Sequence, residues 1–279
     1  MSLVNLDFIS EPATKLIEKV SDAVGGMAKP WQMKRVAKAE AEAEIIRAEA
    51  NIQISDIERR AMERLVREEG KKQENIENIT MKAIPNLSDT AKPENLDNDW
   101  VAMFFDKSRL VSDEKMQEIW AKLLAGEANN QGTFSKKTIE LVSSLDKKDA
   151  ELFTALCSFC VLGGPYIMDY HDEVYTKRGI NFHTINHLQH LGLVATQSLG
   201  YVRKNMSKNI LFVYCGEEYL ICDLKLEEES NSINAGKVSF TTAGEQLAKL
   251  VQAEPVPGFL EYFLEKIRAE HPSASLTKW

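Results

Sequence analysis

The sequence lacks the motifs that identify the common enzyme classes. It has no Walker phosphate loop, no Rossmann glycine fingerprint, no G-x-S-x-G nucleophile elbow and no protein-kinase motif set. Acidic residues are abundant, but they fall on faces predicted to be solvated, where they act as surface charge rather than as an acid–base pair. We therefore expect a non-enzymatic protein with no catalytic residue, no cofactor and no metal site.

Cysteine is scarce, with only Cys157, Cys160, Cys215 and Cys222 in 279 residues. These four lie in apolar runs and are too few for a disulfide-stabilised scaffold. The C-x-x-C pair at positions 157 and 160 is expected in the middle of a helix, where buried thiols are poor metal ligands and poor nucleophiles. The other two cysteines are expected in two strands that flank a hairpin.

A surplus of positive charge and long apolar runs are also absent. The chain has 34 Lys and Arg against 42 Asp and Glu, a formal net charge of −8. This balance opposes a general attraction to nucleic acid or anionic lipid, although a local basic patch would still be compatible with it. No apolar run approaches the roughly 20 residues that span a bilayer. The N-terminus has no basic region and carries Asp7 and Glu11, so we expect no secretory signal and a cytoplasmic protein.

The stretch from Lys38 to Ile76 contains no proline and a single glycine, Gly70, and is rich in residues of high helix propensity. We predict a long charged helix over residues 31–84. Its small and apolar residues recur in steps of three, four and four, an eleven-residue period: Ala43, Ile46, Ala50, Ile54, Ile57, Ala61 and Leu65. Such a period keeps a narrow stripe on one side of a nearly straight helix. Because the stripe is too narrow to wall a globular core, we predict coiled-coil-like assembly of a homo-oligomer, with a lone solvated helix as the alternative.

The remaining patterns divide the chain into further segments. An N-terminal amphipathic segment covers residues 1–30, a proline-containing linker 85–99, a helical domain 100–164 and a winged-helix-like domain 165–279. The predicted fold class is therefore α+β, mainly α with a small β wing. Trp120 is expected to anchor the core of the helical domain.

Helix starts are predicted from residues that cap the free backbone N–H groups. Four starts are expected, at Ser112, Asp146, Asn181 and Thr242. Asp149 and Glu245 each stand three residues after a predicted cap, as in a capping box. Gly192 is expected to end the helix that starts at Asn181.

The C-terminal domain shows a helix followed by short strands. The runs "LGYVRK" and "NILFVYC" are predicted to be strands joined by a hairpin turn at "NMSK". A helix ahead of such a wing can lie in a DNA groove. The candidate nucleic-acid contacts are Lys177, Arg178, His187, Gln189, His190, Arg203, Lys204 and Lys208. Many carboxylates in the same domain oppose DNA binding, so we favour a domain that contacts a protein partner and keep a DNA-binding regulator as the alternative.

A peripheral membrane contact through residues 12–35 is a further alternative. Apolar residues recur at helical spacing from Leu16 onwards, and Trp31 lies between Lys29 and Lys34, an arrangement found at lipid headgroup boundaries. Acidic residues in the same segment oppose this alternative. We therefore favour a short amphipathic helix that docks on the rest of the protein.

The block "MQEIWAKLLAGEANN…SKKTIELVSSLDKKDAELF", Met116–Phe153, resembles the helical core of the bacterial abortive-infection alpha family. The resemblance rests on the pattern W-A-x-L-L-A from Trp120 to Ala125, followed by Leu145, Asp149 and Ala150. It implies a helical fold, a bacterial setting and a role in phage defence as a sensor or effector, and it supplies no catalytic residues. The whole chain also looks like an uncharacterised bacterial family of unknown function, and its charged helix is similar to the coiled segment of flotillin- and stomatin-like proteins.

Overall fold

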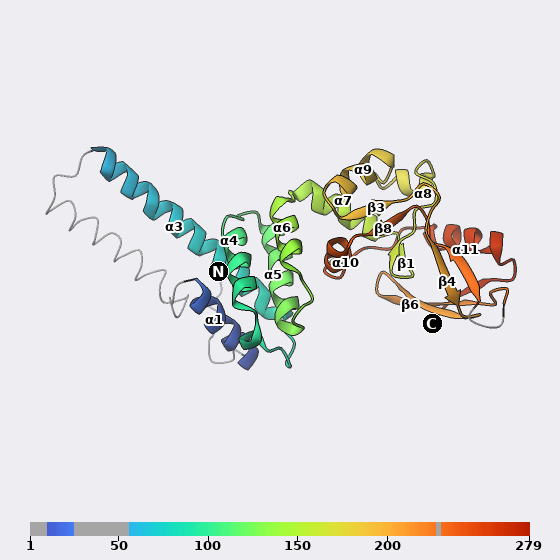
Figure 1. Cartoon of the computed structure of the whole chain (residues 1–279), viewed down its shortest axis with the longest axis horizontal. Coiled ribbons are helices and arrows are strands. Elements are labelled where there is room, and N and C mark those ends of the chain that lie inside the picture. Colours follow the sequence, from blue (N-terminus) through green and yellow to red (C-terminus); the bar gives the residue numbers. More distant parts are fainter. Residues whose placement is uncertain (1–9, 25–55, 227–229) are drawn as a thin grey trace. The chain divides into compact units, whose positions relative to one another are not determined.

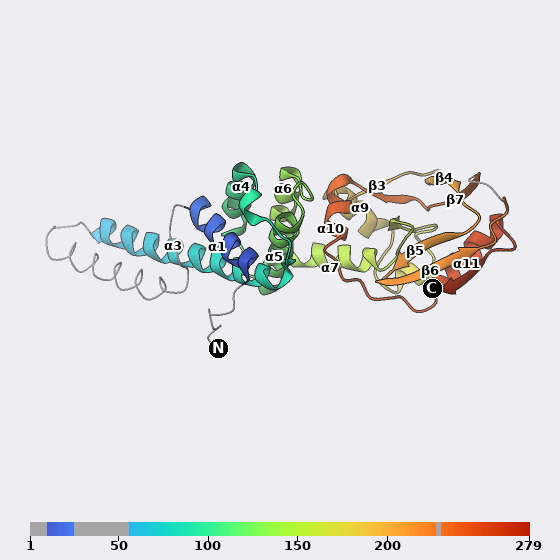
Figure 2. The same ribbon diagram turned by 90° about the horizontal axis from the view of Figure 1, so that it is seen from below.

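The computed structural model describes residues 10–24, 56–226 and 230–279, and it divides the chain into two compact units, residues 1–143 and 144–279. In its described part the first unit is helical, whereas the second combines helices with small antiparallel sheets (Figures 1 and 2). The mixed α+β class predicted from the sequence is confirmed at this level.

The described helices of the first unit come in one run along the chain. They are α1 (Glu11–Ala23), α3 (Asp56–Ala83), α4 (Asn98–Ser108), α5 (Glu114–Asn129) and α6 (Lys136–Ser144), with the 3-10 turns η2 (Ile84–Asn86) and η3 (Pro93–Asn95) between α3 and α4. Trp120 on α5 is fully buried and meets the Phe104 ring edge-on, with centroids 5.1 Å apart, which confirms its predicted place in the core. Trp100 stacks on Phe104 at 5.2 Å and donates its indole N–H to the carbonyl of Phe134 (2.7 Å).

Helix α1 and the segment predicted as a linker both contribute buried residues to this unit. Leu16 and Val20 of α1 are buried, and α1 contacts η3 and α4, as the docked-helix interpretation predicts. The segment predicted as a linker also buries Ala91 and Leu96. The predicted cap Ser112 is wrong by one residue, because the carboxylate of Asp113 accepts the N–H of Met116 (3.0 Å) directly ahead of α5.

The second unit begins with α7, which the sequence pattern grouped with the preceding helices. Its helices are α7 (Lys147–Cys157), α8 (Glu173–Thr176), α9 (Phe182–His190), α10 (Thr242–Ala248) and α11 (Phe259–Glu270). Its strands are β1 (Cys160–Val161), β2 (Gly164–Pro165), β3 (Val194–Thr196), β4 (Val202–Met206), β5 (Ile210–Tyr214), β6 (Glu217–Cys222), β7 (Asn231–Asn234), β8 (Val238–Phe240) and β9 (Ser275–Lys278). All pairs are antiparallel: β1 with β2, β3 with β8, β4 with β7, and β5–β6–β9 in a three-stranded sheet.

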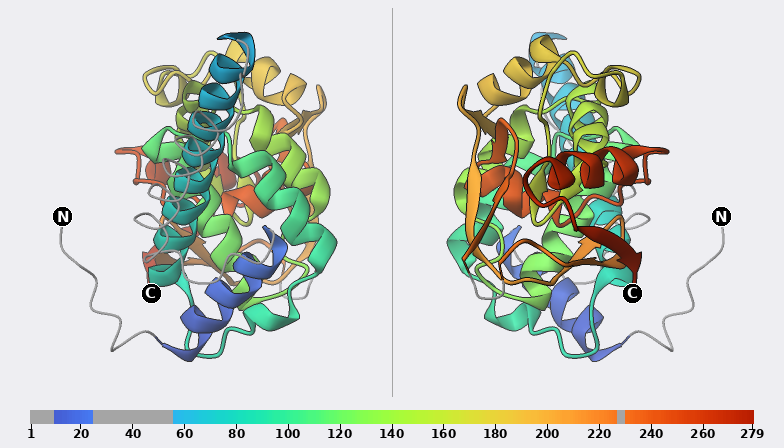
Figure 3. Two further views of the ribbon diagram at one scale, coloured as in Figure 1. Left: turned by 90° about the vertical axis from the view of Figure 1, so that its left-hand side faces the viewer. Right: turned by 90° about the vertical axis from the view of Figure 1, so that its right-hand side faces the viewer.

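The predicted hairpin between β4 and β5 is wrong, because these strands belong to different sheets. The hairpin instead joins β5 to β6 through Cys215 and Gly216, whose φ angles are 47° and 85°. Two positive φ angles in a two-residue turn match the twist of paired strands. Helix α11 covers the inner face of the sheet β5–β6–β9, where Phe263 meets Phe212 with centroids 5.7 Å apart. The right-hand view of Figure 3 brings α11 and β9 to the front.

The helix caps of the second unit largely follow the sequence. Asp146 and Asp149 form the predicted capping box of α7. Asn181 caps α9, and Gly192, with φ 82°, follows its end. The predicted cap of α10 is wrong by one residue, because Thr241 rather than Thr242 accepts the backbone N–H of the third helical residue (3.1 Å).

Candidate functional site

The first turns of α3 carry a row of exposed apolar side chains. Ile57, Met62 and Leu65 are 71%, 50% and 52% exposed, and Ala61 between them is exposed as well. We refer to these four residues as the exposed α3 face. Figure 1 shows the first half of α3 extending past α4 and α5. Of the predicted stripe, Ile57, Ala61 and Leu65 belong to this face. The other four positions lie outside the described residues: Ala43, Ile46, Ala50 and Ile54.

The exposed α3 face continues the side on which α3 packs in its last turns. Ala61 and Leu65 lie eighteen positions before Ile79 and Ala83, an interval of five turns at about 3.6 residues per turn. Ile79 and Ala83 are fully buried, and α3 packs against α5. The same interval relates Ile57 to Asn75 and Met62 to Thr80, and both of these later residues are buried. One helical surface is therefore a core surface at its C-terminal end and open at its N-terminal end.

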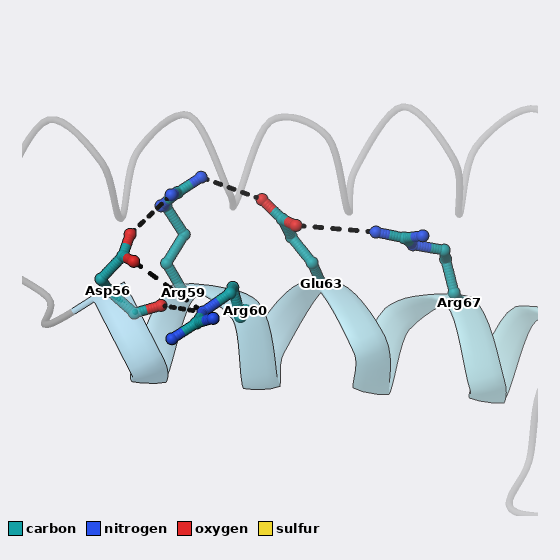
Figure 4. A network of polar contacts seen from close by, with 5 residues as sticks. All are labelled: Asp56, Arg59, Arg60, Glu63 and Arg67. Atoms are coloured by element: carbon teal, nitrogen blue, oxygen red, sulfur yellow. Dashed lines mark hydrogen bonds and ion pairs between the residues drawn. The ribbon is translucent and has the colours of Figure 1, made fainter.

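The opposite side of the same turns is a ladder of ion pairs (Figure 4). Arg59 contacts Asp56 (2.7 Å) and Glu63 (3.4 Å), and Glu63 also contacts Arg67 (3.6 Å). Arg60 lies 3.9 Å from Asp56. Exposed pairs at this spacing contribute only about 0.3–0.5 kcal/mol each to helix stability. These charged residues keep this side of the helix hydrated, so the apolar side is the candidate for binding another surface.

Helix α9 forms a second candidate surface. Its inner residues Ile185 and Leu188 are buried, whereas Phe182 is 52% exposed. His187 is held in place, because its Nε2 lies 2.6 Å from the carboxylate of Asp149 on α7. Burial acts to raise the pKa of Asp149, but hydrogen bonds from His187 and from the backbone of Asp146 outweigh it and lower the pKa below its ordinary value.

The predicted nucleic-acid contacts are spread over α9, the end of α8, and strand β4 with the connection after it. Several already have protein partners: Gln189 accepts a hydrogen bond from Thr196 (2.6 Å), and Lys177 pairs with Glu173 (2.6 Å). The guanidinium of Arg203 lies beside Gly163 and Gly164. Residues 144–279 contain thirteen Lys and Arg against seventeen Asp and Glu. This surface therefore lacks the basic surplus of a typical DNA-binding domain.

The cysteines are placed differently from the prediction. Cys157 ends α7 and Cys160 begins β1, so the C-x-x-C does not lie in mid-helix; only the predicted burial of Cys157 holds. Cys215 sits in the β5–β6 turn rather than in a strand. These three residues line one hollow of about 600 Å³. Their convergence depends on three separate elements, and the spacing in the sequence contains no signal for it.

Two absences bear on ligands and membranes. Within residues 10–24, 56–226 and 230–279, no group of three or more His, Cys, Asp or Glu side chains is arranged to hold a metal ion. In the same described part of the chain, none of the helices combines the length and the apolar character needed to cross a bilayer.

Comparison with known protein families gives a match over most of the chain. The family model described as "Protein of unknown function (DUF2806)" matches residues 59–264, which span most of α3 and nearly all of the second unit's helices. Comparisons with curated proteins and with solved structures each returned no match. The match covers about three quarters of the sequence. The chain therefore belongs to the DUF2806 family of proteins of unknown function.

Proposed function

We propose that the protein is a homo-oligomeric, non-enzymatic interaction protein that assembles through the exposed α3 face. The observation that carries this proposal is the five-turn continuity between the exposed residues and the buried ones on the same side of α3. A helix surface with core-like composition is stable in water only when another surface covers it. A second copy of α3 supplies a matching apolar face in a coiled-coil-like pair.

The size of the effect follows from the exposed fractions. Full burial of an Ile or Leu side chain contributes about 2 kcal/mol. Ile57 and Leu65 are 71% and 52% exposed, so covering both would contribute about 2.5 kcal/mol per chain. In a two-fold symmetric dimer each residue counts twice, giving about 5 kcal/mol, or roughly a thousandfold or more in the dissociation constant.

Sedimentation equilibrium of the full chain tests this proposal. The wild-type protein is expected to give an oligomer mass at micromolar concentration, and Ile57→Asp combined with Leu65→Asp is expected to shift it to a monomer mass. Because both sites are exposed, the fold of the subunit should survive, as circular dichroism would show. The matched control is Arg59→Gln combined with Arg67→Gln, which lowers the net charge by the same two units on the ion-paired side. A monomeric wild type, or an oligomer that both double variants leave intact, would refute the proposal.

We further propose that the second unit contains a winged-helix module that contacts a protein partner. Its support is a set of three helices, α7, α8 and α9, followed by strand β3, which pairs with β8. The paired strands β4 and β7 continue from β3 and β8 and would form the wing. His187 already contacts Asp149, and acidic residues outnumber basic ones in this unit. Both observations favour contact with a protein over contact with DNA. Fluorescence anisotropy with a labelled duplex at low salt should show no binding. A duplex affinity that falls steeply with salt would instead favour a DNA-binding regulator.

We also propose a cytoplasmic setting and a role in phage defence. The resemblance of Met116–Phe153 to abortive-infection proteins supports this proposal. A plaque assay on cells with and without the protein tests it, with fewer plaques expected when the protein is present. Equal plaque counts across a phage panel would count against it.

A further inference from the structure

Three of the four cysteines face one hollow in the second unit. The hollow has a volume of about 600 Å³, and its lining includes Cys157, Cys160, Cys215, Glu245 and Lys249. The cysteines come from the last residue of α7, the first residue of β1 and the tip of the β5–β6 hairpin. The fold therefore gathers thiols from distant parts of the chain around one space large enough for a small molecule.

Within this cluster, Cys157 and Cys160 stand three positions apart in the chain and line the same hollow. The Cys157 thiol lies near enough to raise the pKa of Cys160, and Cys215 raises the same pKa to a smaller degree. The backbone between the pair is a tight turn, in which the N–H of Phe159 donates to the carbonyl of Leu156 (3.0 Å). Cys157 lies within this turn and Cys160 directly follows it, so one short segment of chain brings both thiols to the hollow.

Cys157 is 6% exposed, whereas Cys160 is partly exposed and is the more accessible member of the pair. Cys215 stands at φ 47°, in a left-handed conformation that such turns usually fill with Asn, Asp or Gly. Strained backbone of this kind recurs at functional sites. The turn holds a third thiol at the edge of the hollow.

We propose that Cys157 and Cys160 are a redox modification site, which forms a reversible disulfide by exchange with a small disulfide such as oxidised glutathione. The thiolate of Cys160 attacks one sulfur of the glutathione disulfide, forming a mixed disulfide and releasing one glutathione thiolate. The thiolate of Cys157 then attacks the Cys160 sulfur, closing the protein disulfide and releasing the second glutathione thiolate. The two protons lost by the protein thiols are taken up by the two glutathione thiolates.

The environment of Cys160 makes this exchange slow. The neighbouring thiol of Cys157 and burial both raise the pKa of Cys160 well above its ordinary value. Few thiolates are then available to attack, so the reaction is slow. The disulfide is therefore expected to form over hours in an oxidising glutathione buffer, and to be reduced again when a reducing agent is added.

The test equilibrates the native full chain in glutathione buffers of increasing oxidised fraction, alkylates the remaining thiols in denaturant, and maps tryptic peptides by mass spectrometry. Cleavage after lysine and arginine places Cys157 and Cys160 in one peptide, residues 149–177, and Cys215 and Cys222 in another, residues 209–225. We expect the first peptide to lose two hydrogens without a cross-link, and dithiothreitol to reverse this loss. Cys157→Ser and Cys160→Ser should each abolish it, and the former should accumulate glutathione on Cys160.

Cys222→Ser is the matched control, because Cys222 lies at the end of β6 and does not line the hollow. This variant should oxidise like the wild type. The proposal is overturned if the first peptide stays reduced at every buffer ratio while thiols in urea-unfolded protein oxidise. It is also overturned if oxidation only cross-links the two peptides, since Cys157 or Cys160 would then pair with Cys215 or Cys222 rather than with each other. Circular dichroism of each variant confirms that its second unit is folded.

Discussion

The contact between Asp149 and His187 joins α7 to α9. We expect its removal to lower the stability of the second unit. The Asp149 carboxylate is 11% exposed, receives the His187 Nε2 hydrogen bond (2.6 Å) and accepts the backbone N–H of Asp146 (3.0 Å). Asp149→Ala removes both interactions, so it removes half of the α7 capping box as well as the tie to α9.

The expected cost combines these two losses. A hydrogen bond to a charged group contributes about 1.5–3 kcal/mol and half of a capping box about 0.5–1 kcal/mol. The His187 side chain is 51% exposed, so solvent screening reduces the first figure. We expect a total of about 2 kcal/mol, which corresponds to a roughly thirtyfold change in an opening equilibrium.

Amide hydrogen exchange of residues 147–157 and 182–190 measures this change locally. Both segments should exchange faster in Asp149→Ala, whereas the exposed carboxylate Glu254 serves as a control whose removal changes neither. A double-mutant cycle with His187→Ala should give a coupling of about 1 kcal/mol between the two side chains. Purely additive effects, or protection equal to that of the control variant, would refute the reasoning.

The same contact has a defined pH dependence. The pKa of Asp149 is lower in the folded protein than its ordinary value of 3.8. Its contribution to stability is therefore fully present above that value and is lost as the pH falls below it through the folded pKa. Wild-type and Asp149→Ala proteins should differ most in exchange rates at neutral pH and converge as the pH falls through the lowered pKa of Asp149.

Other predictions concern the cores of both units. Trp100→Phe should destabilise the first unit by about 1–2 kcal/mol more than Trp120→Phe in urea unfolding, because Trp100 donates to a backbone carbonyl (2.7 Å), whereas the buried Trp120 N–H has no hydrogen-bond partner among the described residues. Gly244→Ala should destabilise the second unit by about 2 kcal/mol or more, because the new Cβ would overlap the carbonyl oxygen of Leu193; thermal unfolding at an unchanged midpoint would contradict this. Gly70→Ala, which meets no atom within 4 Å on α3, should instead raise the stability of the first unit by about 0.5–1 kcal/mol.

Local sequence patterns determined the helices of this protein and the apolar sides they present. The buried Trp120 and the caps at Asp146 and Asn181 follow from residues within one or two turns of each other. Such patterns can be predicted because they depend on residues close in sequence. The helical period sets which side chains share a face, and a capping side chain accepts the free backbone N–H groups of the next turn. The two caps missed, before α5 and α10, are displaced by one residue because neighbouring Ser and Asp, or two Thr, are chemically equivalent caps.

Tertiary structure alone decided which strands pair and which side chains meet. Strand β4 pairs with β7 rather than with β5, and β9 at the end of the chain completes the β5–β6 sheet, because register depends on burial of faces far apart in sequence. The tie between Asp149 and His187 spans 38 positions. The gathering of Cys157, Cys160 and Cys215 likewise depends on how a helix end, a short strand and a hairpin tip pack together. The sequence supplied the apolar period of α3, but only the fold showed that one side of this helix is core at one end and open surface at the other.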